Sequence, residues 1–197
     1  MHYVQALEGY CPINAQEKQD QRVILDYVRA FPHNILTREN EFAHITSSGF
    51  IMNPGLDKVL MVHHHIRDTW SWTGGHADGE TDLLGVALRE AREETGIKSV
   101  YPLSKEIASI DILSVFGHWK RGSYVSGHQH LSVAYLLIAE EEQELVVNEA
   151  ENSAVAWFDV AEITEPRFMA RDVYLYQKLI NRAREFGANQ GALLAQS

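Results

Sequence analysis

The sequence predicts an α/β fold, because helical and strand patterns alternate along its 197 residues. Apolar side chains recur at helical spacing over 15–31, 82–95 and 170–186. Between these segments lie short runs rich in β-branched and aromatic residues, which favour strands. With 45% apolar residues, the chain can fill the core of one ordinary domain, and two full domains are not expected.

The first half of the chain combines one helix with two strands. A loop around 12–14 leads into the helix over 15–31, which is expected to stop at Pro32. The runs 42–52 and 58–64 follow as strands, and Asn53-Pro54-Gly55 between them is a turn signal. We therefore expect these two strands to form a hairpin.

The second half begins with the helix predicted most clearly. It spans 82–95, buries one apolar stripe, and ends at Gly96, a natural C-cap. Strands are then predicted at 107–116, 131–139 and 155–158, with loops at 117–130 and 140–144. A final helix is expected over 170–186, and the small-residue-rich tail after Gly187 is expected to fray.

The charge balance limits the classes of partner. The formal net charge is -10, with 27 acidic against 17 basic residues, so the chain should repel nucleic acid and anionic membranes. A phosphorylated small molecule is still an admissible substrate if divalent cations screen the charge at the site.

Cellular location follows from the cysteine content and the N-terminus. A single cysteine, Cys11, permits no intrachain disulfide and no zinc site made of cysteines alone. The chain starts without a basic and apolar signal segment, and no apolar run is long enough to span a bilayer. We expect a cytoplasmic protein.

Three carboxylates on the central helix are the main candidates for chemistry. Glu90, Glu93 and Glu94 stand at i, i+3 and i+4, so they project from one helix face. Like charges at this spacing repel unless a cation lies between them, and carboxylate oxygens suit Mg²⁺ or Mn²⁺ better than zinc. The alternative is a solvated helix face whose acids pair with Arg89 and Arg92.

A glycine-rich loop, Thr73-Gly74-Gly75-His76-Ala77-Asp78-Gly79-Glu80, directly precedes this helix, and backbone can approach a ligand closely there. Loop and helix together resemble the Nudix hydrolase family. Its box reads Gly, five residues, Glu, seven residues, Arg-Glu, an aliphatic residue, any residue, Glu-Glu, any residue, Gly and an aliphatic residue. Set on Gly75, the pattern matches Arg89, Glu90, Ala91, Glu93, Glu94, Gly96 and Ile97.

Two positions depart from the family pattern. The first Glu of the box should fall on Thr81, whereas the nearest acid, Glu80, lies one place earlier. Thr73 replaces the proline that usually precedes the two glycines. The functional equivalence of Glu80 is therefore open, while the helix carboxylates match in register.

The resemblance implies a fold and a domain division. The fold would be a Nudix-type α/β/α sandwich with a mixed β-sheet, plus N-terminal and C-terminal helices. Residues 1–40 would be a helical extension packed on the domain, 41–187 the Nudix hydrolase domain with its C-terminal helix, and 188–197 a flexible tail. A homodimer is left open.

The resemblance also implies metal ligands and a mechanism. Glu90 and Glu94 would be direct ligands of Mg²⁺ or Mn²⁺, Glu93 a direct or water-mediated one, and the carbonyl of Gly74 a further one. Arg89 would hold a Glu in place. The base that activates water would be Glu93 or a loop acid, with Glu151 preferred to Glu149. That acidic loop could equally be a solvated one.

Candidate substrate contacts lie around the box: Gly75, His76, Trp70, His64 and His130. Trp72 and Trp119 are further stacking candidates, although aromatic residues near loops are more often part of the core. Alternation places His128 and His130 on one strand face, where a zinc site would need a further ligand, and ordinary packing is the main alternative.

The expected function is hydrolysis of a phosphoanhydride in a nucleoside diphosphate linked to another moiety. One rival is a non-catalytic nucleotide sensor, which usually has a damaged box. The other is an isopentenyl diphosphate isomerase, which needs a cysteine within the domain, whereas Cys11 lies far upstream. Residues 111–114 carry no subclass tag, so the substrate stays open.

Overall fold

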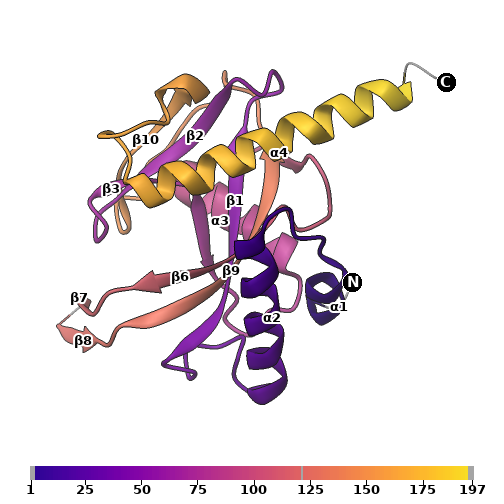
Figure 1. Ribbon diagram of the computed structural model, residues 1–197. Coiled ribbons are helices and arrows are strands. Elements are labelled where there is room, and N and C mark those ends of the chain that lie inside the picture. Colours follow the sequence, from indigo (N-terminus) through magenta and orange to yellow (C-terminus); the bar gives the residue numbers. More distant parts are fainter. Residues whose placement is uncertain (1–2, 121, 195–197) are drawn as a thin grey trace.

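The computed structural model describes residues 3–120 and 122–194, and Figure 1 shows a curled sheet with helices on its two sides. The helices are α1 Tyr3–Gly9, α2 Ala15–Ala30, α3 Leu83–Thr95, the short 3-10 helix η1 Val160–Glu162, and α4 Ala170–Leu194. The strands are β1 Ala43–Met52, β2 Lys58–His64, β3 Thr69–Ser71, β4 Thr73–His76, β5 Tyr101–Pro102, β6 Ser109–Val115, β7 His118–Lys120, β8 Ser123–Val125, β9 His128–Ile138 and β10 Asn152–Asp159.

The sheet is mixed, as predicted. Its main path runs β10-β2-β1-β9-β5, with β3 on β2, β4 on β1 and β6 on β9. Strands β1 and β9 are parallel, whereas β1 and β2 form the expected antiparallel pair. Because β1 pairs with β2, β4 and β9, it is the strand that brings the glycine-rich loop beside the rest of the sheet.

Two apolar cores lie on opposite faces of the sheet. Side chains of α1, α2 and α3 pack in one core with alternate residues of β1 and β9, such as Ile45 and Val133. The other core joins α4 to the intervening residues of the same strands, such as Phe50 and Ala134. This alternation follows from the strand pleat and produces the layered arrangement.

Some element boundaries differ from the prediction. The segment 117–130 was expected to be a loop, which is wrong: β7 and β8 pair as a ribbon, and β9 begins at His128. Trp119 and Tyr124 of this ribbon are exposed, so it lacks the buried alternation that reveals a strand. Residues 3–9 also form a helix that was not predicted.

The last helix is longer than expected. Its backbone remains helical to Leu194 rather than ending at Phe186. Glycine in a helix costs about 1 kcal/mol relative to alanine, but it does not by itself end a helix whose neighbours are good helix formers such as Ala and Leu. Among the described residues, no helix has both the length and the apolar character that crossing a bilayer requires.

Helix α3 is fixed at both ends by local sequence. The carboxylate of Asp82 accepts a hydrogen bond from the Gly85 N–H at 3.1 Å, which caps the N-terminus. Gly96 ends the helix with φ of 73°, a left-handed conformation that favours glycine. Val86, Ala87 and Ala91 are fully buried. Glu90 follows Val86 by four residues and Glu94 follows Ala91 by three, so both acids project beside this buried stripe.

Candidate active site

The glycine-rich segment lies directly against the carboxylates of α3, and its first half, Thr73–His76, is strand β4 where a loop was predicted. Gly74 and Gly75 belong to β4 and pair with Ser48 and Ser47 of β1. A Cβ on Gly75 would lie 2.5 Å from the carboxyl carbon of Glu90, so a larger residue would displace that carboxylate. A Cβ on Gly74 would lie 2.8 Å from the Cα of Ser48. Both glycines are therefore required for this close approach.

Glu94 is the most buried acid of the cluster, with 5% of its surface exposed. The backbone N–H of Gly74 hydrogen-bonds to its carboxylate, but Oε2 is buried without a partner. Burial, together with the nearby charges of Glu90 and Glu151, raises the pKa of Glu94 to about 9. By itself, the chain therefore leaves this carboxyl without the positive charge that would stabilise its ionised form.

Glu90 and Glu93 differ from each other in burial. Burial raises the pKa of Glu90, opposed by the Arg89 guanidinium, whose Nη2 lies 3.0 Å from Oε1. The Glu93 side chain is 56% exposed, and its Oε1 lies 3.8 Å from Arg89 Nε. Arg89 also pairs with Glu80, so the out-of-register acid of the box is joined to the cluster through this arginine.

These residues fit a hard divalent cation. Glu90 and Glu94 supply carboxylate oxygens, of which Glu94 Oε2 is buried and without a hydrogen-bond partner among the described residues, and the Glu90 carboxylate fills the space that a side chain on Gly75 would take. Arg89 pairs with Glu80, Glu90 and Glu93, and among the described residues none of its ion pairs involves Glu94. Mg²⁺ and Mn²⁺ prefer such oxygen ligands and retain water in their coordination shell.

The two acids of the loop before β10 are not equivalent. The charge of Glu151 acts on both Glu90 and Glu94 and raises the pKa of each. For Glu149, the contact that the structure records is its backbone carbonyl, 3.2 Å from His65 Nε2. Electrostatic proximity therefore favours Glu151 as the acid that belongs to the cluster.

The predicted substrate contacts fall into two groups. Trp70 packs edge-on against Phe158 and His63, while the ring nitrogen Nδ1 of His64 accepts a hydrogen bond from the Ile66 N–H at 3.1 Å. His76 and His130 lie together instead, with ring centroids 4.9 Å apart. Trp72 is buried against Tyr176 and is a core residue, not a stacking platform.

His44 was missed by sequence reasoning. It is buried at the start of β1, and its ring lies 4.9 Å from that of His76. Nothing near it in the sequence indicates this contact, because the pairing of β1 with β4 and β9 creates it.

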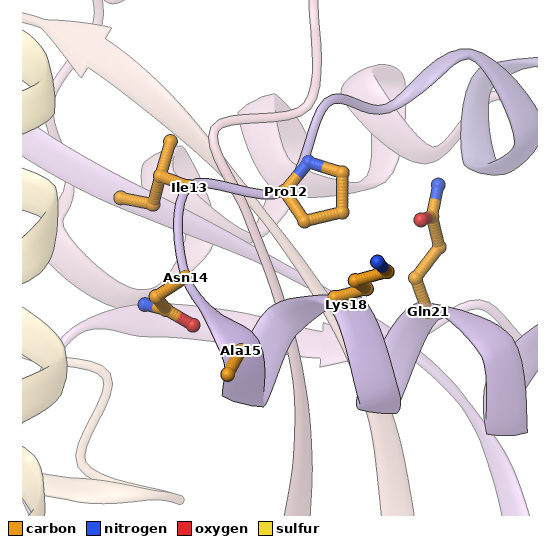
Figure 2. A pocket seen from close by; sticks show the side chains of 6 residues that line it. All are labelled: Pro12, Ile13, Asn14, Ala15, Lys18 and Gln21. Atoms are coloured by element: carbon orange, nitrogen blue, oxygen red, sulfur yellow. The ribbon is translucent and has the colours of Figure 1, made fainter.

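Figure 2 shows a surface hollow at the start of α2, lined by Pro12, Ile13, Asn14, Ala15, Lys18 and Gln21. Among the described residues, its lining includes none of the predicted site residues and only one charged side chain, Lys18. It lacks the convergent polar groups of a substrate site, so we assign it no function.

The chain resembles known proteins in both sequence and fold. Residues 43–179 match the NUDIX domain, while no curated protein matches the chain at a significant level. A NUDIX-family hydrolase from Clostridium perfringens is similar in structure, with a TM-score of 0.50 and 20% identity over 70% of this chain and 96% of that one. The E. coli dihydroneopterin triphosphate pyrophosphohydrolase has a TM-score of 0.51 and 16% identity over 69% and 94%.

At these identities the structural likenesses show the fold alone, and they confirm the predicted α/β fold with its mixed sheet and terminal helices. The NUDIX match covers well over half of the chain. The chain therefore belongs to the Nudix hydrolase family, whose members act on pyrophosphate bonds.

Proposed function

We propose that this enzyme hydrolyses a phosphoanhydride bond in a nucleoside diphosphate linked to another moiety, with Mg²⁺ or Mn²⁺ as cofactor. The observation that carries the proposal is Glu94, a buried acid with an unpartnered oxygen beside Glu90 and Glu151. Gathering acids in this way is unfavourable for the chain alone, so it makes sense only where a cation and an anionic substrate complete the site.

The metal would be held mainly by α3. Glu90 and Glu94 would bind it directly, Glu93 directly or through water, and the carbonyl of Gly74 would add an oxygen from β4. When bound, the cation supplies neutralisation of the bridging oxyanions and a lowered pKa for the attacking water. Arg89 would keep the Glu90 carboxylate in place through its 3.0 Å contact.

Glu151 is our choice for the general base. It would take a proton from water as the water oxygen bonds to phosphorus and the bridging P–O bond breaks, with the departing phosphate oxygen carrying away the electron pair. Its charge already acts on Glu90 and Glu94, which supports a position beside the cluster. Glu93 remains the alternative within the box.

Substrate recognition would use groups beside the cluster. The backbone at Gly75 reaches the Glu90 carboxylate, so it is placed to approach a phosphate that shares the cation. Trp70 and His64 lie on the adjoining strands β3 and β2, where they could contact the rest of the substrate. The half-exposed Trp70 ring is the candidate for stacking on a base.

A substrate panel tests the reaction directly. The purified chain would be assayed with nucleoside diphosphate-linked compounds, nucleoside triphosphates, sugar nucleotides and non-nucleoside diphosphates. Each assay would contain Mg²⁺ or Mn²⁺ in ¹⁸O-labelled water. We expect a nucleoside monophosphate and a second phosphorylated product, one of them carrying ¹⁸O, with their formation abolished by a chelator and restored by the metal.

Two results would point elsewhere. Tight nucleotide binding without any phosphate product would establish the sensor function instead. Conversion of isopentenyl diphosphate without incorporation of ¹⁸O would establish an isomerase. Either outcome contradicts the hydrolase proposal.

The choice of base has its own matched pair of variants, Glu151→Gln and Glu149→Gln, which change neighbouring acids of one loop. We expect Glu151→Gln to lower kcat by about a hundredfold and to remove the acidic limb of its pH profile. Glu149→Gln should retain nearly normal activity. If both changes had equally small effects, Glu151 would be rejected as the general base and Glu93 would be favoured.

A further inference from the structure

Four histidines meet on one face of the sheet, apart from the carboxylates of α3. They are His44 on β1, His76 on β4, and His128 and His130 on β9. His44 is the register partner of His130, and His76 that of Thr46, two residues after His44 on the same face. Three strands that are distant in the sequence thus deliver four imidazoles to one place.

The distances approach those of a metal site. One ring nitrogen from each histidine can be chosen so that all four lie within 4.8 Å of one another, and His128 Nε2 is 3.2 Å from His130 Nε2. Tetrahedral zinc with Zn–N bonds of about 2.0–2.1 Å places its ligand nitrogens about 3.4 Å apart. The nitrogens that lie farthest apart would have to approach one another by up to about 1.4 Å to reach that geometry.

Hydrogen bonds from outside the cluster orient two of the rings. His44 Nδ1 lies 2.9 Å from the Asn40 carbonyl, and His128 Nδ1 lies 2.9 Å from the Ser126 carbonyl. A carbonyl oxygen can only accept, so each Nδ1 carries the proton and each Nε2 presents its lone pair. Metal-binding histidines are typically held in this way.

Among the residues that the structure describes, none satisfies the lone pair of His44. Its Nε2 is buried and has no hydrogen-bond partner, although the residue itself is only 4% exposed. A buried polar atom without a partner costs free energy. A cation bound by all four would remove that cost.

Charge selects the kind of cation. Burial lowers the pKa of His44 and lowers that of His130 to about 2, so these two rings are neutral, which is the form that binds metal. Neutral imidazoles suit zinc and similar transition metals, whereas Mg²⁺ and Mn²⁺ prefer oxygen. The carboxylate of Asp78, whose charge acts on His44 and His76, adds a nearby negative charge.

We infer that His44, His76, His128 and His130 form a second metal site, a closed structural zinc site that fastens β4 to β1 and β9. His76 directly follows Gly74 and Gly75, so the zinc would also anchor the end of the loop that reaches the α3 carboxylates. In this assignment His76 and His130 are metal ligands, not substrate contacts. The assignment does not depend on the substrate or on the proposed hydrolysis.

Metal analysis of the full chain tests the inference. Protein purified after zinc addition, then treated with a weak chelating resin, should retain about one zinc ion per chain, as a closed tetrahedral site does. Excess Mg²⁺ should not displace it. Replacement by Co²⁺ should produce the visible absorption of a tetrahedral nitrogen site.

Matched variants locate the bound zinc. His76→Gln and His128→Gln should each lose the zinc and the rise in melting temperature that zinc causes in the wild type. His33→Gln, which changes an exposed histidine outside the cluster, should keep both. Glu94→Gln should also keep the zinc, because it alters only the carboxylate site. Circular dichroism of each variant checks folding.

Three results would overturn the assignment. One is a folded wild-type chain that retains no zinc. The second is full zinc retention in both His76→Gln and His128→Gln. The third is loss of zinc in Glu94→Gln, which would place the ion among the carboxylates.

Discussion

Two buried glutamates, Glu17 and Glu94, have opposite surroundings. Glu17 is fully buried on α2, where Lys178 Nζ lies 2.8 Å away and the Tyr10 hydroxyl and the Ile13 N–H donate hydrogen bonds. Glu94 is nearly as buried on α3, but the charged groups that act on it are other acids, Glu90 and Glu151. The charge of Glu17 is balanced by Lys178, whereas among the described residues the groups around Glu94 supply no positive charge.

The pKa values follow this difference. Burial alone would raise the pKa of Glu17, but the hydrogen bonds from Ile13, Lys178 and Tyr10 outweigh it and lower the pKa. The pKa of Glu94 is raised to about 9 by burial and by its acidic neighbours. A buried acid that the chain neutralises supports the fold, whereas one that the chain leaves unpaired indicates a site for a ligand.

Removing the buried lysine should have the largest effect on stability. Lys178 lies between Glu17 and Asp111, with Nζ 2.7 Å from Asp111 Oδ1. Lys178→Met leaves two buried acids without their cation, and we expect it to lower the free energy of unfolding by about 3–5 kcal/mol. Urea denaturation measures this. Lys105→Met, an exposed control, should leave stability nearly unchanged, and equal effects of the two would contradict the comparison.

Removing a charge from the proposed metal site on α3 should lower the rate of hydrolysis and not the stability of the fold. Glu94→Gln and Glu90→Gln should each lower kcat at least about a hundredfold, since each removes a charged ligand. Thermal melting with a chelator present should be no lower for Glu94→Gln, because the amide replaces a carboxyl that is already neutral. Near-normal rates in both variants would disprove the metal assignment.

A methyl group added at Gly75 tests whether the Glu90 carboxylate must keep its observed position. In Gly75→Ala, the new Cβ would displace the Glu90 carboxylate, so we expect kcat to fall by about tenfold to a hundredfold. Gly9→Ala is the matched control, because no heavy atom lies within 4 Å of its Cβ position. Full activity in Gly75→Ala would mean that Glu90 need not keep its observed position.

The smallest expected effect is on the acid dependence of stability. The folded pKa of Glu17 lies below its ordinary value of 4.5, so its contribution to stability is present above pH 4.5 and is lost as the pH falls through the folded pKa. Glu17→Gln should therefore weaken the fall in stability below pH 4.5. Urea titrations at several pH values would measure this, and an unchanged acid dependence would refute the role of Glu17.

Features that depend on the spacing of residues within one segment could be predicted from the sequence. Helix α3 was predicted almost to the residue, because its apolar stripe and its C-cap Gly96 are signals local to this segment. The gathering of Glu90, Glu93 and Glu94 on one face follows from the same 3.6-residue period. The family resemblance also rests on this continuous stretch, and the match to the NUDIX domain bears out the family.

Contacts between residues that are far apart in the sequence became visible only in the folded chain. It brought His44 to His76, His128 and His130, joined Lys178 to Glu17, and distinguished Glu151 from Glu149 by its charge on the α3 acids. Spacing within one helix is set by local geometry, so the sequence shows it directly. Contacts between strands depend on which segments pair and in which register, and that depends on how the whole core packs.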